Sequence, residues 1–181
     1  MRLFIALPLE EEWNQSIFQL TNPLRNSLQA TWVAPHQYHI TLQFLGEVET
    51  TMVKVIDQKL SEVCSMIENP VKCCFQSVTY FPDYNRPKAL VLSLIKNPIL
   101  EILSQLVQKK MTEIDLPRKS PFILHVTLAR FKQPFRPTGA LPVIPFVKML
   151  EINRFAFIQS TLNSSGPIYT EIKSYSLVKG S

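Results

Sequence analysis

Two of the three histidines in this chain of 181 residues begin the same short pattern: histidine, any residue, threonine, leucine. The two copies read His39-Ile40-Thr41-Leu42 and His125-Val126-Thr127-Leu128. Because side chains alternate across a β-strand, each histidine shares one face with its threonine, and the aliphatic residues share the other face. The repeat therefore predicts two strands, each with a buried aliphatic face and an open face that carries an imidazole and a hydroxyl.

Two imidazoles and two hydroxyls around one ligand suit a tetrahedral phosphodiester. In-line displacement puts the attacking and leaving oxygens on opposite sides of phosphorus, and imidazole, with an ordinary pKa of about 6.5, can act as base or acid near neutral pH. Threonine hydroxyls can donate to the non-bridging oxygens. We therefore expect His39 and His125 to be catalytic, and Thr41 and Thr127 to bind substrate. His36 lacks the threonine and is expected to be a surface or capping residue.

The segments around the two motifs alternate between helical and strand-like patterns. Helical periodicity covers residues 9–28, with a kink or break at Asn22-Pro23, residues 53–67 behind a cap from Thr50 or Thr51, and a helix opened by Asn97-Pro98. Strand-like runs cover residues 2–7, 38–45, 71–80, 89–95, 123–131, 152–160 and 168–177. Helices mixed with paired strand runs favour an α+β fold over a doubly wound parallel sheet. The proline-rich stretch 133–145 is expected to be a long loop.

The composition indicates a folded globular protein, and the net charge indicates which kind of partner it can bind. The chain is 46% hydrophobic and 18% charged, as in a folded globular protein, and its net charge of +5 is compatible with an anionic partner. Because it has only 4 glycines, no glycine-rich phosphate loop is available. Side chains must therefore hold any bound phosphate.

Several other features exclude alternative classes. A catalytic zinc usually takes three protein ligands, and neither motif has a Cys, Asp or Glu at ligand spacing, so we expect no metal and no cofactor. Three cysteines without a Cys-x-x-Cys pair argue against a disulfide framework and favour a reduced compartment.

The apolar N-terminal run is short, ends in Glu10-Glu11-Glu12, and lacks a small-residue cleavage site, so it is not expected to be a signal sequence. We expect a cytoplasmic monomer that does not engage a membrane.

Basic and aromatic residues outside the motifs suggest a path for RNA. The basic ones are in Asn85-Arg86-Pro87-Lys88, Arg118-Lys119 and Lys132, and they either line an RNA backbone or are solvated loop charges. Phe81 and Tyr84 are candidates to stack on a base, with Phe131 a further aromatic nearby. Strict alternation from His39 puts Phe44 on the aliphatic face, so we assign it to the core.

The paired motifs resemble those of the two-histidine phosphoesterase superfamily, and specifically of the LigT-like RNA 2′,3′-cyclic phosphodiesterases, once named 2′-5′ RNA ligases. The resemblance covers nearly the whole chain. Besides the motifs, it includes Arg2-Leu3-Phe4-Ile5-Ala6-Leu7-Pro8, Trp32-Val33, Phe44-Leu45-Gly46-Glu47-Val48, Pro121-Phe122, Ala129-Arg130, Ser160-Thr161-Leu162 and Gly166-Pro167-Ile168-Tyr169.

This resemblance implies a single bilobal domain over residues 1–181. Its two pseudo-symmetric lobes would each be a mainly antiparallel sheet backed by helices, with the active cleft between them. It also implies metal-independent hydrolysis of 2′,3′-cyclic phosphate ends of RNA or nucleotides to 2′-phosphomonoesters. His39 would be the general acid, His125 the general base, and Thr41, Thr127 and Arg130 would bind the phosphate.

Two positions depart from a simple match. The family usually has proline directly before the second histidine, whereas this chain has Ile123-Leu124, which we expect to affect substrate entry beside His125 rather than the mechanism. Strict alternation also places Arg130 on the face away from the imidazoles. It reaches them only if the strand ends or bulges after Leu128.

Two other functions remain open. The same chemistry run backward would join a 2′,3′-cyclic phosphate end to a 5′-hydroxyl, as a 2′-5′ RNA ligase does. A module that binds RNA ends or nucleotides without catalysis would need only the cleft and the hydroxyls, so that the presence of both histidines argues against it.

Overall fold

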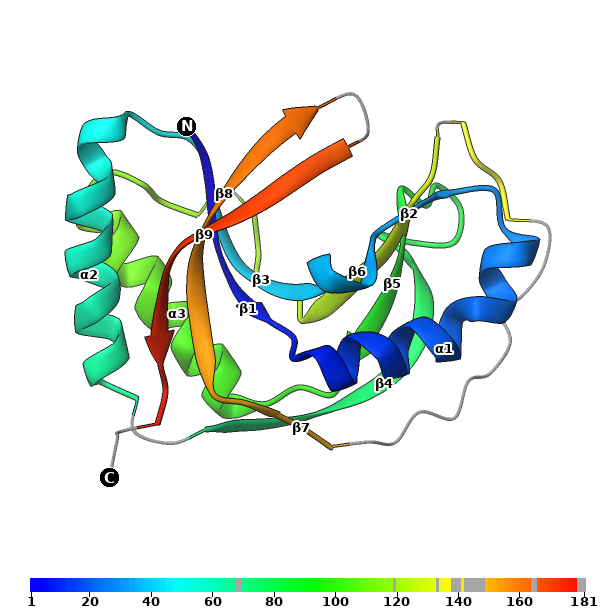
Figure 1. Ribbon diagram of the computed structural model, residues 1–181, viewed down its shortest axis with the longest axis horizontal. Helices are drawn as coiled ribbons and strands as arrows, with labels where there is room; N and C mark the ends of the chain where they lie inside the picture. Colours follow the sequence, from blue (N-terminus) through cyan, green and yellow to red (C-terminus); the bar gives the residue numbers. More distant parts are fainter. Residues whose placement is uncertain are drawn as a thin grey trace.

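The computed structural model describes residues 1–67, 70–118, 120–132, 134–137, 141, 149–163 and 166–178. These residues form an α+β fold with three α-helices and nine strands in the described part of the chain (Figure 1). In chain order, the elements are β1 (Arg2–Pro8), α1 (Glu11–Ser27), β2 (Thr31–Trp32), η1 (Pro35–Gln37), β3 (His39–Glu47), η2 (Thr50–Met52), α2 (Val53–Ser65), β4 (Val71–Phe81), β5 (Ala89–Leu94), α3 (Pro98–Thr112), β6 (His125–Arg130), β7 (Met149–Ile152), β8 (Arg154–Asn163) and β9 (Gly166–Ser176).

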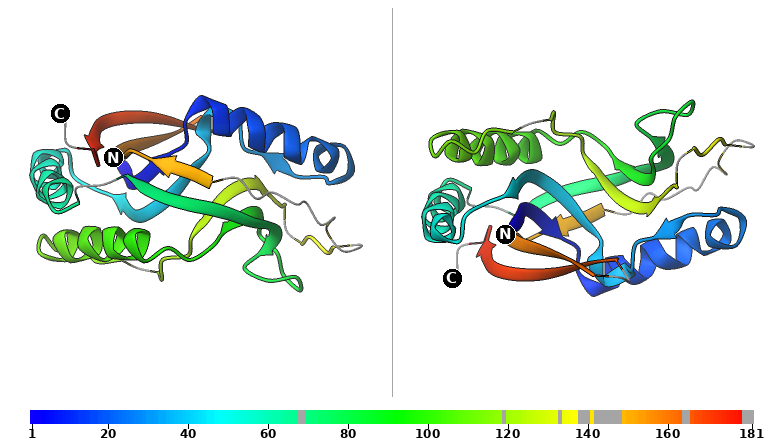
Figure 2. Two further views of the ribbon diagram at one scale, coloured as in Figure 1. Left: turned by 90° about the horizontal axis from the view of Figure 1, so that it is seen from below. Right: turned by 90° about the horizontal axis from the view of Figure 1, so that it is seen from above.

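The strands form one sheet in the order β7-β4-β5-β6-β3-β1-β8-β9, with β2 paired to β6. Neighbouring strands run antiparallel throughout this sheet, and the two motif strands, β3 and β6, are neighbours in the middle. In the chain, α1 lies between β1 and β3, with β2 and η1 after it, and α3 lies between β5 and β6. Figure 2 shows α1 and α3 toward opposite sides of the molecule, with strands between them. The α+β fold with a large antiparallel sheet is confirmed, whereas the two lobes and the single domain stay predictions.

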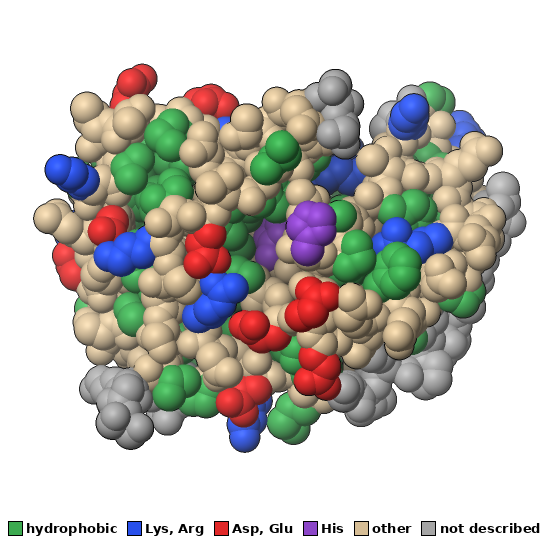
Figure 3. All heavy atoms as spheres, viewed as in Figure 1, with side chains coloured by type: hydrophobic (Ala, Val, Ile, Leu, Met, Phe, Trp, Pro, Cys, Tyr) green, Lys and Arg blue, Asp and Glu red, His purple; other side chains and the backbone are tan. Residues whose placement is uncertain are grey.

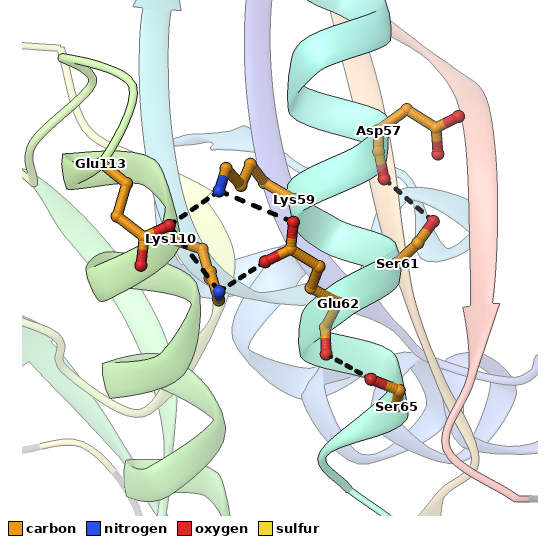
Figure 4. A network of polar contacts seen from close by, with 7 residues as sticks. All are labelled: Asp57, Lys59, Ser61, Glu62, Ser65, Lys110 and Glu113. Carbon is orange, nitrogen blue, oxygen red and sulfur yellow. Dashed lines mark hydrogen bonds and ion pairs between the residues drawn. The ribbon is translucent and has the colours of Figure 1, made fainter.

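One main hydrophobic core joins the sheet to the helices. Helix α3 buries Leu100, Leu103 and Val107, and α2 buries Ile56 and Leu60, all at helical spacing. Helices α2 and α3 are also linked by ion pairs. Lys59 and Glu62 of α2 lie opposite Glu113 and Lys110 of α3, as Figure 4 shows. The Lys59 Nζ–Glu113 Oε2 distance is 2.8 Å.

The sequence predicted most element boundaries within a few residues, with three differences. Helix α1 continues through Pro23 without a break, because Ile17 and Leu24 on either side stay buried on one face and hold the helix to the core. The predicted threonine cap of α2 is replaced by the turn η2, and Met52 precedes the helix. The run 152–160 divides between β7 and β8.

Other features follow the sequence. The Asn97 side chain accepts hydrogen bonds from the backbone N–H groups of Ile99 and Leu100, which confirms the predicted cap of α3. Most of the predicted loop 133–145 lies outside the described residues. None of the described helices combines the length and apolar character needed to cross a bilayer.

Candidate active site

The two motif strands lie side by side in the sheet. Ile40 of β3 pairs with Val126 of β6, and both side chains are fully buried on the core side. In an antiparallel pair in this register, each motif histidine lies opposite the other motif's threonine, and the two histidines form a diagonal pair with Cβ atoms about 7 Å apart. The two motif strands are direct neighbours, and the four polar side chains share one face of the sheet.

The two imidazoles are held in the same way. His39 Nδ1 lies 2.7 Å from the carbonyl oxygen of Gln37, and His125 Nδ1 lies 2.7 Å from that of Ile123. A carbonyl only accepts, so each Nδ1 carries the hydrogen and donates it. The Nε2 atoms are thereby left to exchange protons with a ligand. The departure at Ile123-Leu124 changes the side chains before His125 but keeps this carbonyl.

Both strands bulge directly after the motif threonine. In the β1–β3 ladder Ile5 pairs with Gln43 and Ala6 with Thr41, which leaves Leu42 as an extra residue. In the β5–β6 ladder Leu90 pairs with Ala129 and Val91 with Thr127, which leaves Leu128 as the extra residue. An extra residue in one strand interrupts the alternation of side chains and reverses the face of those that follow.

The bulges decide where the residues after each motif point. Leu128 and Ala129 are both buried, and Arg130 is exposed beyond them. The bulge that Arg130 was expected to need in order to reach the imidazoles is present after Thr127. The charge of Arg130 also lowers the pKa of both His39 and His125.

The equivalent bulge in β3 overturns the assignment of Phe44 to the core. Leu42 and Gln43 are both buried, and Phe44 is 56% exposed. Its ring lies 5.9 Å from that of Phe4, which also contacts His39. Phe44 thus occupies, after the first motif, the place that Arg130 occupies after the second. Alignment of the two repeats, rather than strict alternation, was the signal that could have located it.

In each bulge, the carbonyl group of the extra leucine accepts a hydrogen bond from a residue outside its strand. Arg118, in the segment after α3, donates to the Leu42 carbonyl at 3.2 Å and to Ser104. The Val33 backbone N–H donates to the Leu128 carbonyl at 2.9 Å. Arg118, which we had considered for an RNA path, is therefore a structural residue of the first bulge. Lys119 lies outside the described residues.

Aromatic rings surround the imidazoles. His39 contacts Phe4 and Tyr169 at centroid distances of 5.1 and 5.4 Å, and His125 stacks on Phe81 at 5.0 Å with 15° between the rings. Neither Phe4 nor Tyr169 was predicted to lie beside the imidazoles. Figure 3 shows histidine side chains at the centre of one face, beside a hollow that hydrophobic side chains border.

The environment of the two imidazoles lowers the pKa of both. Burial, opposed by the hydrogen bond to Gln37 and reinforced by Arg130 and His125, lowers the pKa of His39 to about 4. Burial and Arg130 also lower the pKa of His125, against the hydrogen bond to Ile123. Both rings are therefore neutral in the free protein at pH 7. An anion bound between them favours the protonated form, because it offsets the charge of Arg130.

The two threonines complete the polar set. Thr41 and Thr127 are half-buried, and neither hydroxyl has a hydrogen-bond partner among the residues that the structure describes. Together with two Nε2 atoms and one guanidinium, they offer hydrogen-bond donors and proton-exchanging groups on one face. That arrangement can bind a tetrahedral anion and transfer protons at two of its oxygens.

Comparison with known proteins gives the same family from sequence and from structure. Residues 7–91 match the family described as LigT like Phosphoesterase. A Bacillus subtilis protein named RNA 2′,3′-cyclic phosphodiesterase is 32% identical, over 96% of this chain and 95% of that protein. An Archaeoglobus fulgidus protein with the same name is 29% identical, over 96% of this chain and 98% of that protein.

Solved structures agree with this placement. The crystal structure of TT0787 of Thermus thermophilus superposes with a TM-score of 0.85 and 28% identity, over 98% of both chains. Escherichia coli LigT, crystallised with 3′-AMP, superposes with a TM-score of 0.83 over 98% of both chains, and at 20% identity it shows the shared fold. Because the Bacillus subtilis relative exceeds 30% identity over almost the full length of both proteins, this chain belongs to the LigT-like phosphoesterase family.

Proposed function

We propose that this protein hydrolyses 2′,3′-cyclic phosphate ends of RNA or nucleotides to 2′-phosphomonoesters, without a metal ion. The observation that carries the proposal is the pair of identically anchored imidazoles on adjacent strands, both of which have their pKa lowered in part by the charge of Arg130. The curated relatives in Bacillus subtilis and Archaeoglobus fulgidus carry the name of this activity, which supports the assignment.

In the proposed reaction the histidines act on opposite sides of phosphorus. His125 Nε2 takes a proton from water, and the water oxygen forms a bond to phosphorus. The bond from phosphorus to the 3′ oxygen breaks, and protonated His39 gives its Nε2 proton to that oxygen. The products are a 2′-phosphomonoester and a 3′-hydroxyl, and a proton passes from His125 back to His39 through solvent before the next turnover.

The remaining polar groups stabilise the charge on phosphate. Arg130, Thr41 and Thr127 donate to the non-bridging oxygens, where negative charge increases in the transition state. Because the pKa of His39 is low in the free protein, this imidazole takes up its proton from solvent when the substrate binds. The negative charge of the cyclic phosphate favours this uptake, because it raises the pKa of an imidazole beside it.

The test is turnover of a nucleoside 2′,3′-cyclic phosphate in excess EDTA, with the product position identified by phosphorus NMR. His39→Ala and His125→Ala should each reduce kcat by roughly 100- to 10,000-fold, the usual contribution of general acid–base catalysis. Thr41→Val and Thr127→Val should cost roughly tenfold, the worth of one hydrogen bond to a charged group. His36→Ala is the matched control and should retain full activity, since His36 is exposed and outside the motifs.

The assay also separates the alternatives. Labelled RNA with a 2′,3′-cyclic phosphate end, incubated with a second strand bearing a 5′-hydroxyl, reports opened and joined products together. Retention of the rate in both histidine variants, or loss of activity in EDTA, would contradict the proposed mechanism.

A further inference from the structure

Gln37 makes one contact through its backbone and another through its side chain, and the two contacts reach different parts of the fold. Its carbonyl oxygen accepts the hydrogen bond from His39 Nδ1 at 2.7 Å. Its side-chain Nε2 donates to the carbonyl oxygen of Pro167 in β9, also at 2.7 Å and 130 residues further along the chain. One residue therefore joins the first motif histidine to the β8–β9 hairpin.

The second motif has no counterpart of this side-chain contact. Ile123, whose carbonyl holds His125 in the same way, has an aliphatic side chain that is 47% exposed and cannot donate a hydrogen bond. The backbone anchor of a motif histidine thus works without a polar side chain at the anchoring residue. The amide of Gln37 therefore has a separate role at the first motif.

A turn with its own hydrogen bonds holds Gln37 in place. In η1 the Gln37 N–H donates to the Ala34 carbonyl at 2.9 Å, and the Tyr38 N–H donates to the Pro35 carbonyl at 3.0 Å. Tyr38 is 1% exposed, and its hydroxyl accepts from Arg25 at 2.7 Å. Because its neighbours are fixed in this way, Gln37 can hold a segment that is less firmly attached.

That segment is the outer half of the β8–β9 hairpin. Strand β8 pairs with β1 from Ala156 to Gln159, whereas Ser160 to Leu162 pair with β9 alone among the described strands. Figure 1 shows the ends of both strands extending away from the rest of the sheet. Tyr169 is the partner of Ser160 in this outer half. Because a two-stranded hairpin is only marginally stable by itself, contacts with the rest of the protein determine where this part lies.

Tyr169 packs against the imidazole that Gln37 anchors. Its ring meets the His39 ring edge-on, with centroids 5.4 Å apart and 87° between the planes. Phe4 contacts both rings, at 5.0 Å from Tyr169 and 5.1 Å from His39. Pro167 is two residues before Tyr169, which is one repeat of the strand. The hydrogen bond from Gln37 therefore fixes β9 directly beside the ring that contacts His39.

These contacts form a closed loop around His39. The Gln37 carbonyl binds the imidazole at Nδ1, and the Gln37 amide binds the strand whose Tyr169 packs against the same imidazole. Proton transfer from Nε2 requires a fixed ring, and a displacement of about 1 Å can reduce the rate on the order of 100-fold. The tyrosine ring also covers part of the imidazole, in agreement with the burial that lowers the pKa of His39 to about 4.

We propose that Gln37 is a positioning residue for His39, because its side-chain amide holds the outer half of the β8–β9 hairpin so that Tyr169 stays packed against the imidazole. The proposal rests on the proposed function, in which His39 gives a proton to the leaving oxygen. It adds a residue outside both motifs to those on which the reaction depends.

The test variant is Gln37→Met, which keeps the length of the side chain and removes the donor. For a nucleoside 2′,3′-cyclic phosphate, kcat should fall roughly 10- to 100-fold and KM should change less than about threefold, because the imidazole is misplaced while the phosphate-binding groups remain. The pKa of His39, measured by NMR titration of the ring protons, should rise from about 4 by roughly one pH unit, since water gains access to the ring.

Gln15→Met is the matched control. It makes the same substitution on α1 and removes an exposed side-chain hydrogen bond, from Gln15 to Glu11. Both kcat and the pKa of His39 should keep their wild-type values in this variant.

A double-mutant cycle determines whether the effect of Gln37 passes through the hairpin. Tyr169→Leu removes the ring contact directly, so it should also lower kcat and raise the pKa of His39. If Gln37 acts through Tyr169, the double variant Gln37→Met/Tyr169→Leu should be at most about twofold slower than the slower single variant, whereas independent effects multiply.

Three results would overturn the proposal: losses that multiply in the double variant, a loss confined to KM, or a wild-type pKa of His39 in Gln37→Met. The NMR titration requires no turnover. Failure of the proposed function would abolish hydrolysis in the wild-type protein as well, and the titration would still report whether Gln37 and Tyr169 hold His39.

Discussion

His39 and His125 share the same backbone anchor but have different neighbours. Each donates from Nδ1 to the carbonyl two residues earlier, whereas His39 lies between Phe4 and Tyr169 and His125 stacks on Phe81. The more enclosed His39 has its pKa lowered to about 4. Enclosure by apolar rings thus keeps both imidazoles neutral until an anion arrives, which links substrate binding to protonation.

Binding of a tetrahedral anion should therefore take up protons. Sulfate is the suitable probe, because it does not titrate near neutral pH. Near pH 6 the free protein has neutral His39, and bound sulfate raises the pKa of that imidazole, so the complex should gain a proton. Calorimetry in buffers of different ionisation enthalpy measures this number. His39→Gln should abolish most of the uptake, and a wild-type value of zero would contradict the linkage.

The same imidazole should make the fold less stable in mild acid. Its pKa is about 4 in the folded protein and about 6.5 when unfolded, so the unfolded chain binds more protons between these values. The free energy of unfolding should therefore fall as the pH drops from 6.5 toward 4, by up to about 3 kcal/mol from this group.

Urea unfolding at pH 7 and pH 4.5 measures this effect. The difference between the two pH values should be smaller in His39→Gln than in the wild-type protein, because glutamine does not titrate. The exposed His36→Gln should keep the wild-type difference. An unchanged difference in His39→Gln would show that other groups cause the acid sensitivity.

The bulges in β3 and β6 are the elements that assemble the site. Each one inserts a leucine after the motif threonine and turns the second residue beyond it onto the histidine face. The released carbonyls find donors far away in the chain, as Arg118 does for Leu42. Loss of such a donor leaves a polar group of the bulge unsatisfied and lets the strand change its register.

Arg118→Met should therefore loosen β3. We expect a loss of about 1 to 3 kcal/mol in the free energy of unfolding, the cost of unsatisfied buried hydrogen-bonding groups, together with a fall in kcat. Arg118→Lys should recover part of both, since lysine can donate to the Leu42 carbonyl. Arg154→Met is the matched control, because Arg154 forms partly exposed ion pairs with Glu10 and Glu171 and has no contact with the bulge. Normal kcat in a folded Arg118→Met protein would argue against a positioning role.

The shared core connects the two sides of the sheet. Side chains of β1 and α1 belong to the same main cluster as those of β5, β6 and α3. Trp13 of α1 also contacts Phe75 of β4, at a ring distance of 6.1 Å. A sheet that continues through the β3–β6 pair and a core that crosses it favour unfolding as one cooperative unit.

Leu103→Ala tests this cooperativity. Leu103 of α3 is fully buried, and its truncation should cost about 2 to 5 kcal/mol. Both tryptophans lie outside α3, on α1 and β2, and should nevertheless report the same lowered transition as far-UV circular dichroism. Separate transitions for fluorescence and circular dichroism would indicate that two lobes unfold independently.

Local patterns in the chain were sufficient to predict most of the elements and the faces of the two motif strands. Alternation within each motif correctly separates His39 and Thr41 from Ile40, and an asparagine followed by proline correctly begins α3. These features depend on neighbours within a few residues, and the relevant geometry, a period of two or a cap at a helix start, is repeated in all proteins.

Tertiary structure alone decided which strands are neighbours and which residues follow the histidines onto the open face. Phe44 was misplaced because alternation holds only while each residue has one partner across the ladder. The register with β1 determines whether Leu42 pairs with a residue across the ladder. The carbonyl of Leu42 accepts its hydrogen bond from Arg118, which is 76 residues away in the chain. A bulge is an interaction between distant segments, so the short-range pattern of the strand that contains it carries no sign of it.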